Sequence, residues 1–380
     1  MSVLRSVVIA GAGIGGLTAA LALAARGIDV RILEKAERLE AVGAGIQLSP
    51  NASRILIGLG LEPRLGSVVL VPDAVSIMTA RSGGEVSRVP LGSSGKPYWA
   101  VHRADLQAAL LSACSEHPQI ELQLGQPITD FSVDSHGAVI IPGLAPALAL
   151  IGADGVHSQV RRRLFPDVRP RFSGLVAWRG IVDSWPHELP PRRVELWMGP
   201  RAHLVAYPMS SGGRVNVVAI VPGAAESSDA AAADIAGHFA ASRWPAGAVS
   251  MIAAVGEWRR WPLFTLPDGG VWNAGPITLL GDSSHAMLPF AAQGAGMAIE
   301  DAAVLAQCLA EANMADIPAA LARYASLRAP RVSRVQRTAR QSGQIYHLRG
   351  PMALARDLVM KMLGPGPLQA RQNWIYDWTP

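Results

Sequence analysis

Glycines near the N-terminus have the spacing that lets a backbone approach a phosphate closely. The segment Gly11-Ala-Gly13-Ile-Gly-Gly16 lies between the apolar residues 7–9 and an Ala/Leu-rich stretch, which predicts a strand, a tight turn and a helix. Backbone amides and the positive end of such a helix can bind a pyrophosphate. Glu34 ends the next predicted strand, where a carboxylate can accept hydrogen bonds from an adenosine ribose. The pattern predicts a dinucleotide site and leaves NAD and FAD open.

Two aspartates follow later predicted strands. Asp154 stands in Asp-Gly-Val-His-Ser-Gln-Val-Arg, after the apolar residues 147–151, and Asp282 stands in Gly-Asp-Ser-Ser-His, after residues 277–280. Taken singly, Asp154 could belong to a common Asp-Gly turn, Asp282 could cap the following helix, and His285 could be a hydrogen-bonded interior histidine. No spacing typical of a metal site surrounds His285, so no metal is expected.

Together, the glycine segment with Glu34, the Asp154 motif and residues 281–294 resemble the motifs of the single-component FAD-dependent aromatic hydroxylases. The resemblance spans most of the chain. It implies that one FAD is bound tightly and that NADH or NADPH visits transiently, with Asp154 near both cofactors. It also implies that Asp282 binds the hydroxyl-rich ribityl chain of the flavin. The backbone carbonyl of Pro289 is expected to lie near the reacting oxygen and the substrate.

Other segments resemble the parts of these enzymes that surround the flavin. Residues 43–51 resemble the loop beside the isoalloxazine ring, with a simple glycine turn as the alternative. Arg103, in His-Arg-Ala-Asp-Leu, resembles an arginine that reaches FAD from a helix start. A helix beginning near Gly294 would stabilise negative charge on reduced flavin, although Ala291 stands where relatives often have Gly. The cofactor-binding residues that the resemblance implies are Gly11, Gly13, Gly16, Glu34, Lys35, Gly45, Ile46, Arg103, Asp154, Asp282, Gly294, Ala295 and Gly296.

His203 and Tyr207, in His-Leu-Val-Ala-Tyr-Pro, are the main clue to the substrate. Residues four apart on a strand face the same side of a sheet, so both rings are expected to point together. Near a phenolic hydroxyl such a pair could accept or relay its proton, which activates the ring for oxygenation. The motif resembles enzymes acting on salicylate, 3-hydroxybenzoate and 6-hydroxynicotinate; two half-buried sheet aromatics are the alternative. We expect His203, Tyr207 and Pro289 to be the catalytic residues.

The resemblance implies a complete reaction. FAD is reduced by NADH or NADPH, dioxygen adds at the flavin 4a carbon, and the distal oxygen passes to a small, hydroxylated and carboxylated aromatic or heteroaromatic substrate. A flavin-dependent halogenase is disfavoured, because Trp258-Arg-Arg-Trp261-Pro lacks the Trp-x-Trp-x-Ile-Pro spacing of that class. The alternatives left open are an epoxidase-like enzyme with a non-phenolic substrate and a non-catalytic FAD-binding regulatory module. Asp154, Arg161 and Asp282 argue against the module.

Two packed lobes must position these residues, since 380 residues exceed what one core usually holds. Strand, helix and strand patterns predict an α/β, Rossmann-type lobe that binds FAD. Tryptophans among β-rich, Pro/Gly-punctuated segments predict an inserted, mostly antiparallel β lobe that binds the substrate. The FAD-binding lobe is expected over residues 1–72, 101–169 and 272–330, the substrate lobe over 73–100 and 170–271, and a helical C-terminal segment over 331–380.

Composition is that of a globular enzyme, with half of the residues apolar and 17% charged. The two cysteines, Cys114 and Cys308, indicate neither a disulfide scaffold nor a zinc site, and a cytoplasmic location is expected. The uncharged residues 7–25 could suggest a membrane span. Their glycines favour a strand and a helix instead, so no membrane association is expected.

Arginine carries almost all of the net charge of +5, and four arginines recur at every third position of a predicted late helix. These are Arg331, Arg334, Arg337 and Arg340. No aromatic residues interleave this stripe, so nucleic acid binding is not expected. A solvated helix face, or a face that contacts the second subunit of a homodimer, is the favoured interpretation.

Overall fold

A computed structural model describes residues 6–39, 44–91, 97–183, 192–209, 213–226, 235–310 and 312–380. One layer is a six-stranded sheet with the order β17-β18-β11-β1-β2-β8, parallel except at the edge pair of β17 and β18. Its strands are β1 (Ser6–Ala10), β2 (Asp29–Leu33), β8 (Ile120–Gln123), β11 (Ala149–Gly152), β17 (Asn273–Ala274) and β18 (Ile277–Leu279). The chain crosses from strand to strand as a Rossmann-type lobe requires.

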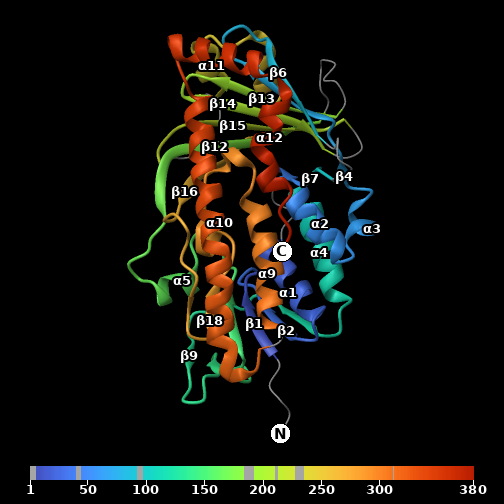
Figure 1. The fold of residues 1–380 in the computed structure, drawn as a ribbon, viewed down its shortest axis with the longest axis vertical. Coiled ribbons are helices and arrows are strands. Elements are labelled where there is room, and N and C mark those ends of the chain that lie inside the picture. The colour runs from blue at the N-terminus through green and yellow to red at the C-terminus, as the bar shows by residue number, and fades with distance from the viewer. Residues whose placement is uncertain are drawn as a thin grey trace.

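The central strand β1 reads as a continuous apolar run because both faces of this sheet are covered. Val7 and Ile9 pack in one core with the helices, whereas Val8 packs in a second core on the opposite face. Helix α1 (Ile14–Ala24) lies beside α9 (Gly294–Leu309) against the sheet (Figure 1). Gly15 allows this close packing, since a Cβ there would lie 2.6 Å from Cδ2 of Leu280.

The second layer is a seven-stranded sheet with the order β16-β12-β15-β14-β13-β5-β6. Every neighbouring pair is antiparallel except β13 and β5. Its strands are β5 (Ala74–Thr79), β6 (Glu85–Pro90), β12 (Arg171–Val182), β13 (Arg193–Gly199), β14 (Ala202–Pro208), β15 (Val215–Pro222) and β16 (Arg259–Thr265). These strands come from two separate chain segments, as expected for an inserted lobe.

Smaller elements complete the fold. Strands β3 (Gly45–Leu48), β4 (Val69–Leu70) and β7 (Trp99–His102) form a three-stranded sheet, and β9 (Ser132–Val133) pairs with β10 (Val139–Ile140). The short helices are α2 (Pro50–Gly58), α3 (Glu62–Leu65), α5 (Gln159–Leu164), α6 (Ile235–Ala241), α7 (Ala246–Ala253), α8 (Asp282–His285), η2 (Pro289–Ala291) and η3 (Met314–Asp316), and α4 (Arg103–Ser115) is longer.

A long helix connects the two layers along one side of the molecule. Helix α10 (Ile317–Tyr346) spans 30 residues and runs from the parallel sheet to the seven-stranded sheet (Figure 1). The chain then continues through α11 (Gly350–Leu363) and α12 (Pro365–Tyr376), which both pack on β6. The C-terminal segment is therefore helical, and its last residues return to α2 and α10, where Arg54 and Arg331 contact Trp378 (Figure 1).

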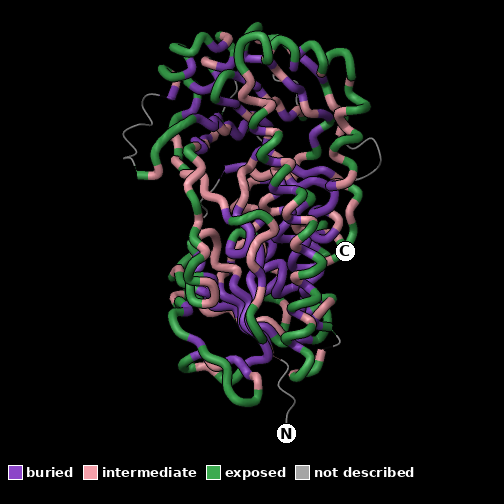
Figure 2. The backbone as a smooth tube through the Cα atoms, turned by 60° about the vertical axis from the view of Figure 1, so that its left-hand side comes forward, coloured by how far each residue is buried: buried purple, intermediate pink, exposed green. Residues whose placement is uncertain are grey.

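Buried residues run through the interior of both layers, while exposed residues lie mainly at the two ends of the molecule (Figure 2). One large core surrounds the parallel sheet and its helices, and a separate core lies between the seven-stranded sheet and helices α6 and α7. The architecture confirms the predicted fold class, an α/β lobe with an inserted, mostly antiparallel lobe and C-terminal helices. Within the described part of the chain, no helix is long and apolar enough to cross a membrane.

Candidate functional site

The glycine segment forms a tight turn between β1 and α1. Gly11 has a φ of +106°, and a Cβ there would lie 2.6 Å from the carbonyl oxygen of Ala153, so only glycine fits. A Cβ at Gly16 would lie 2.0 Å from the carbonyl oxygen of Gly11. Gly13 is the N-cap of α1, and a Cβ there would meet no atom within 4 Å. No side chain caps this helix, so its first amides are placed to receive a phosphate.

The Glu34 carboxylate holds the glycine turn from the end of β2. Its Oε2 accepts a hydrogen bond from the Ala12 amide at 2.8 Å, and its Oε1 accepts one from the Ala36 amide at 3.0 Å. Each carboxylate oxygen can accept a second hydrogen bond, so Glu34 can still bind a ribose hydroxyl. Lys35, the next predicted cofactor residue, is exposed at the same edge.

The Asp154 and Asp282 motifs are physically tied to each other. Arg161, which is fully buried, donates from NH1 to the Ser283 carbonyl at 2.8 Å and from NH2 to the Val156 carbonyl at 2.6 Å. Oδ2 of Asp154 accepts the amide of Gln159 at 2.7 Å at the start of α5. Asp154 is thus part of a turn and of a helix start, and its other oxygen is free for a second role.

Arg103 and Asp282 face a common space together with an arginine that the sequence analysis did not select. Arg103 begins α4, Asp282 begins α8 with Gly281 as its N-cap, and Arg179 projects from β12. Burial lowers the pKa of Arg179, Tyr207 and Asp282 raise it, and Arg103 lowers it. These groups therefore lie within electrostatic range of one another. A lone arginine inside the apolar run Val-Ala-Trp-Arg-Gly-Ile-Val was the signal available.

Two of the buried polar atoms that lack partners among the described residues belong to Asp154 and Arg179. Oδ1 of Asp154 and Nε of Arg179 are both buried without a hydrogen bond. Buried polar atoms are almost always hydrogen-bonded, so these two fit a ligand that carries hydroxyl, amide or phosphate groups. A ligand with phosphate groups would also suit the uncapped start of α1 and the open space at Gly13. The Arg179 guanidinium could bind such a group as well. The residues present fit a bound dinucleotide.

The loop before α9 carries the predicted residues Pro289, Gly294, Ala295 and Gly296. The Pro289 carbonyl accepts the Ala292 amide at 2.9 Å, which closes the turn. Ala292 has a φ of +50°, a left-handed conformation that costs a residue with a Cβ about 1 kcal/mol. Helix α9 then begins at Gly294 without a side-chain cap or an acidic residue in its first turn. Its start can therefore stabilise negative charge.

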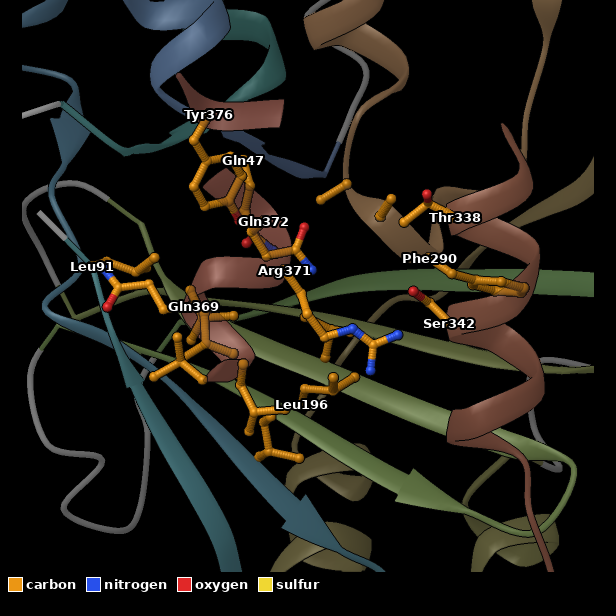
Figure 3. Close-up of a pocket in the computed structure, with 18 of the residues that line it drawn as sticks. Gln47, Leu91, Leu196, Phe290, Thr338, Ser342, Gln369, Arg371, Gln372 and Tyr376 are labelled. Carbon is orange, nitrogen blue, oxygen red and sulfur yellow. The ribbon is translucent and has the colours of Figure 1, made fainter. Parts of the chain in front are cut away.

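A cavity of about 270 Å³ lies between this loop, the seven-stranded sheet, α10 and α12 (Figure 3). Its apolar wall comes from alternate residues of neighbouring strands, which share one face of the sheet. These are Val75 and Ile77 of β5, Val194 and Leu196 of β13, and His203 and Val205 of β14. Gln47, Pro289, Phe290 and Ala291 close the opposite side. The cavity is small, with an apolar wall on the sheet and many polar side chains on α10 and α12.

His203 lies in the cavity wall and is 2% exposed. Its ring packs edge-on against Phe290, with centroids 5.0 Å apart, and against Tyr346, with centroids 5.5 Å apart. Nδ1 of His203 lies 2.8 Å from Nε2 of His347, a residue that the sequence analysis did not select. Burial lowers the pKa of His203 to about 3, with His347 adding to the effect. His203 is therefore neutral at neutral pH.

Tyr207 lies on the same face of β14, beside the predicted flavin loop. A Cβ at Gly45 would lie 2.8 Å from the Tyr207 hydroxyl oxygen, so glycine is required where the two elements meet. Burial raises the pKa of Tyr207, while Arg179 and a hydrogen bond with Gln47 oppose that shift. The Tyr98 hydroxyl donates to Oε1 of Gln47 at 2.7 Å. Gln47 thus links Tyr207 to the cavity. Ile46 lies beside it in β3, and Gly43 falls outside the described residues.

Helix α12 closes the cavity with polar side chains that the sequence analysis did not assign to it. Gln369, Arg371, Gln372 and Tyr376 all line the cavity. The Arg371 side chain extends from α12 into the cavity, opposite Ser342 of α10 (Figure 3). Arg371 is an exposed residue of α12, and its charge lowers the pKa of Tyr346 against the larger raising effect of burial. A guanidinium that extends into a cavity can bind an anion.

Three of the four arginines of the α10 stripe, Arg334, Arg337 and Arg340, are exposed, as expected for a solvated face, whereas Arg331 is not. Nε and NH2 of Arg331 each lie 2.6 Å from Glu300, and its guanidinium lies 4.7 Å from the Trp378 ring centroid. Arg334 lies 3.8 Å above the Trp374 ring. Aromatic residues that are distant in sequence therefore cover this part of the stripe. Arg340 pairs instead with Asp268.

His285 is an interior histidine, as one interpretation of its motif expected. It is fully buried, and Nε2 lies 2.6 Å from Oδ2 of Asp301. Burial alone would raise the pKa of Asp301, but His285 and Arg328 lower it below its ordinary value. Among the described residues, no group of His, Cys, Asp and Glu side chains is arranged to hold a metal ion.

Comparisons with known proteins agree with this geometry. A family model described as "FAD binding domain" matches residues 5–339. The chain is 34% identical to a 3-hydroxybenzoate 6-hydroxylase from Polaromonas naphthalenivorans (strain CJ2), over 98% of this chain and 96% of that protein. It is 36% identical to a 3-amino-4-hydroxybenzoate 2-monooxygenase from Streptomyces cremeus, over 93% and 91%. The crystal structure of Klebsiella pneumoniae HpxO complexed with FAD and uric acid is similar, with a TM-score of 0.85, 27% identity, and coverage of 98% and 96%.

Proposed function

This chain belongs to the FAD binding domain family, and from that premise we propose that it hydroxylates the ring of a small hydroxylated aromatic carboxylic acid. The protein is an FAD-dependent monooxygenase of the aromatic hydroxylase class. NADH or NADPH is the proposed electron donor and dioxygen the proposed oxidant. The observation that carries the substrate proposal is the lining of the cavity, in which a buried histidine on β14 and an arginine on α12 flank the apolar wall of the sheet.

Bound FAD supplies the electrons taken from NAD(P)H and the activated oxygen that is transferred to the ring. The glycine turn with Gly11, Gly13 and Gly16 would hold its phosphates, and Glu34 would hold its ribose. Asp154, Asp282 and Arg103 would hold its remaining polar groups, and the α9 helix start at Gly294, Ala295 and Gly296 would face the flavin ring. The partnerless atoms of Asp154 and Arg179 support this assignment.

The cavity suits a single aromatic ring. Its volume of about 270 Å³ lies just below the usual range for drug-sized ligands, which begins at about 300 Å³. Strand β14 provides one wall and the loop at Pro289 provides the wall nearest the α9 helix start. A ring placed between them is held against the side from which oxygen would be delivered.

His203 and Tyr207 are the proposed proton-handling groups. An aromatic ring is attacked more readily when its hydroxyl is ionised, so removal of the phenolic proton assists the reaction. Neutral His203 has a ring nitrogen that can accept this proton. Tyr207, whose pKa is raised by burial, keeps its own proton and can donate a hydrogen bond. The hydrogen bond between Tyr207 and Gln47 connects this group to the loop beside the flavin.

Arg371 is the proposed partner of the substrate carboxylate. Its guanidinium enters the cavity from α12, on a different element from His203 on β14 (Figure 3). A guanidinium can bind a carboxylate through two hydrogen bonds, which orients the ring as well as retaining it. Hydroxyl recognition by one wall and carboxylate recognition by the other would select a hydroxybenzoate over a simple phenol.

The test compares 3-hydroxybenzoate, 3-hydroxybenzamide and phenol as stimulants of NADH and NADPH oxidation, with identification of the aromatic product. We expect the carboxylate to be preferred and oxygen to enter para to the phenolic hydroxyl. Arg371→Gln should raise KM for 3-hydroxybenzoate by about tenfold or more, the scale of a lost hydrogen bond to a charged group, and leave KM for phenol unchanged. Arg349→Gln, at an exposed arginine, is the matched control. Oxidation of NAD(P)H without any hydroxylated product would contradict the proposal.

A further inference from the structure

His347 contacts the cavity histidine from behind. It is the C-cap residue of α10, and its Nε2 lies 2.8 Å from Nδ1 of His203, with ring centroids 5.0 Å apart. His203 is almost fully buried and lines the cavity, whereas His347 is half-buried. The pair therefore leads from the cavity wall to the outer end of α10.

The short contact limits which ring atoms can carry protons. Two neutral imidazole nitrogens at 2.8 Å must share one hydrogen, because one of them has to donate. When Nδ1 of His203 is the donor, Nε2 of His203 is left as an acceptor and Nε2 of His347 receives the hydrogen bond. His347 then carries its own proton on Nδ1. This arrangement has an acceptor at the first ring and a removable proton at the second.

We propose that His203 and His347 form a two-imidazole relay that carries the phenolic proton of the substrate out of the cavity. This inference rests on the proposed function. The O–H bond of the phenol breaks as its proton passes to Nε2 of His203. The Nδ1 proton of His203 passes to Nε2 of His347, and the Nδ1 proton of His347 passes to water. Each ring gains and loses one proton, so both remain neutral with reversed tautomers, and the bound phenolate keeps the negative charge.

The turn that carries His347 is held in place by buried polar contacts. NH1 of Arg356 donates to the carbonyls of Ile345 at 3.1 Å and Tyr346 at 3.0 Å. Arg356 forms an ion pair with Asp357 at 2.8 Å, and Oδ2 of Asp357 accepts the Thr79 hydroxyl of β5 at 2.8 Å. These contacts fix the end of α10 to the same sheet that carries His203. The two imidazoles are therefore positioned from both sides.

The surroundings favour transfer without accumulation of an imidazolium. Burial lowers the pKa of His347 to about 4, as it lowers that of His203. On β13 and β15, the residues paired with His203 are Met198 and Ile220, which do not titrate. The titratable or charged groups near the pair on the helices are Tyr346 on α10, Arg356 and Asp357 on α11, and Arg371 on α12. A charged imidazolium is unfavourable in these surroundings, so His203 can accept a proton only if it gives up its other proton. The second imidazole, His347, receives that proton.

The experiment measures proton release when the oxidised holoenzyme binds 3-hydroxybenzoate, by stopped-flow with a pH-indicator dye. His347→Gln retains a hydrogen-bonding group toward His203 but cannot relay a proton. We expect at least a tenfold slower proton release and hydroxylation in this variant, with KM and FAD content unchanged. His347→Ala should be slow in the same way, and added imidazole should restore its rate. His238→Gln, at an exposed histidine of α6, should behave as wild type.

Wild-type rates of proton release and hydroxylation in both His347 variants, with no effect of imidazole, would overturn the relay. If the wild-type enzyme hydroxylates 3-hydroxybenzoate in that case, the proposed function stands and only the relay fails. If the wild type hydroxylates no phenol at all, the proposed function and the relay fail together. A slow His347→Ala variant that imidazole does not restore, with normal His347→Gln, would assign His347 a packing role and also overturn the relay.

Discussion

Replacement of Arg331 with methionine would remove one of the contacts that tie the C-terminus to the core. Nε and NH2 of Arg331 each lie 2.6 Å from the fully buried Glu300, and its NH1 and NH2 donate to the carbonyls of Trp374 at 3.2 Å and Ile375 at 3.1 Å. Those two carbonyls belong to the end of α12, the helix that closes the cavity. One side chain therefore supports both the stability of the fold and the closure of the site.

The expected loss of stability follows from the charge that remains. Removing one partner of a buried ion pair costs about 3–5 kcal/mol, because the other charge stays buried. Glu300 keeps the Asn51 amide at 2.6 Å and Arg328 NH1 at 2.8 Å, so we expect the lower end, about 3 kcal/mol. Unfolding entropy of about 2.1 cal/mol/K per residue gives about 0.8 kcal/mol/K for 380 residues. The melting temperature should fall by about 4 °C.

Differential scanning calorimetry measures this shift, and product formed per NADH consumed measures closure of the cavity. Arg337→Met is the matched control, since Arg337 is an exposed arginine of the same helix. We expect lower thermal stability and a lower yield of product per NADH only in Arg331→Met. Equal melting temperatures of the two variants would refute the reasoning about the buried Glu300. A normal product yield at reduced stability would show that the Arg331 contact stabilises the fold but is not needed to close the cavity.

Asp282→Ala should weaken retention of FAD, because this carboxylate is the proposed partner of the ribityl chain. The ratio of flavin absorbance to protein after gel filtration measures FAD retention. Normal FAD occupancy in the variant would show that Asp282 does not bind the ribityl chain. Tyr207→Phe and His203→Ala should each slow hydroxylation by about a hundredfold or more with FAD still bound, whereas unchanged product rates would leave both as structural sheet residues. Burial lowers the pKa of His203 to about 3 and that of His347 to about 4. The ordinary histidine pKa is about 6.5, so at pH values below about 6.5 the unfolded chain binds more protons than the folded chain. Stability should therefore fall as pH drops from about 6.5 toward 4, and His347→Gln should flatten that fall in urea titrations; an identical slope would show that the pair is not buried neutral.

Local sequence patterns were sufficient to predict the parallel sheet and the inserted lobe. The turn at Gly11 needs a positive φ and a close approach to Ala153, and these demands leave a visible glycine spacing. The apolar run of β1 reflects burial on both faces of the sheet. The spacing of His203 and Tyr207 reflects the two-residue period of a strand. Each of these features is determined by contacts within or next to one element.

The residues that were not predicted depend on contacts between distant parts of the chain. His347 reaches His203 across 144 positions, and nothing in the sequence around either residue indicates the other. Arg371 enters the cavity because α12 folds back on β6. The burial of Arg331 could not be predicted for the same reason, since the aromatic residues that cover it follow more than forty positions later. Tertiary contacts of this kind carry no periodic signal.

The most direct test of the proposed chemistry is isotope incorporation during turnover with 3-hydroxybenzoate, NADH or NADPH and isotopically labelled dioxygen, followed by mass spectrometry of the product. We expect one labelled oxygen atom in each molecule of a dihydroxylated benzoate, formed in step with NAD(P)H consumption. An unlabelled product would show that the new oxygen comes from water. Recovery of unchanged 3-hydroxybenzoate, with all the labelled dioxygen converted to hydrogen peroxide, would contradict the assignment of this cavity as a site of aromatic hydroxylation.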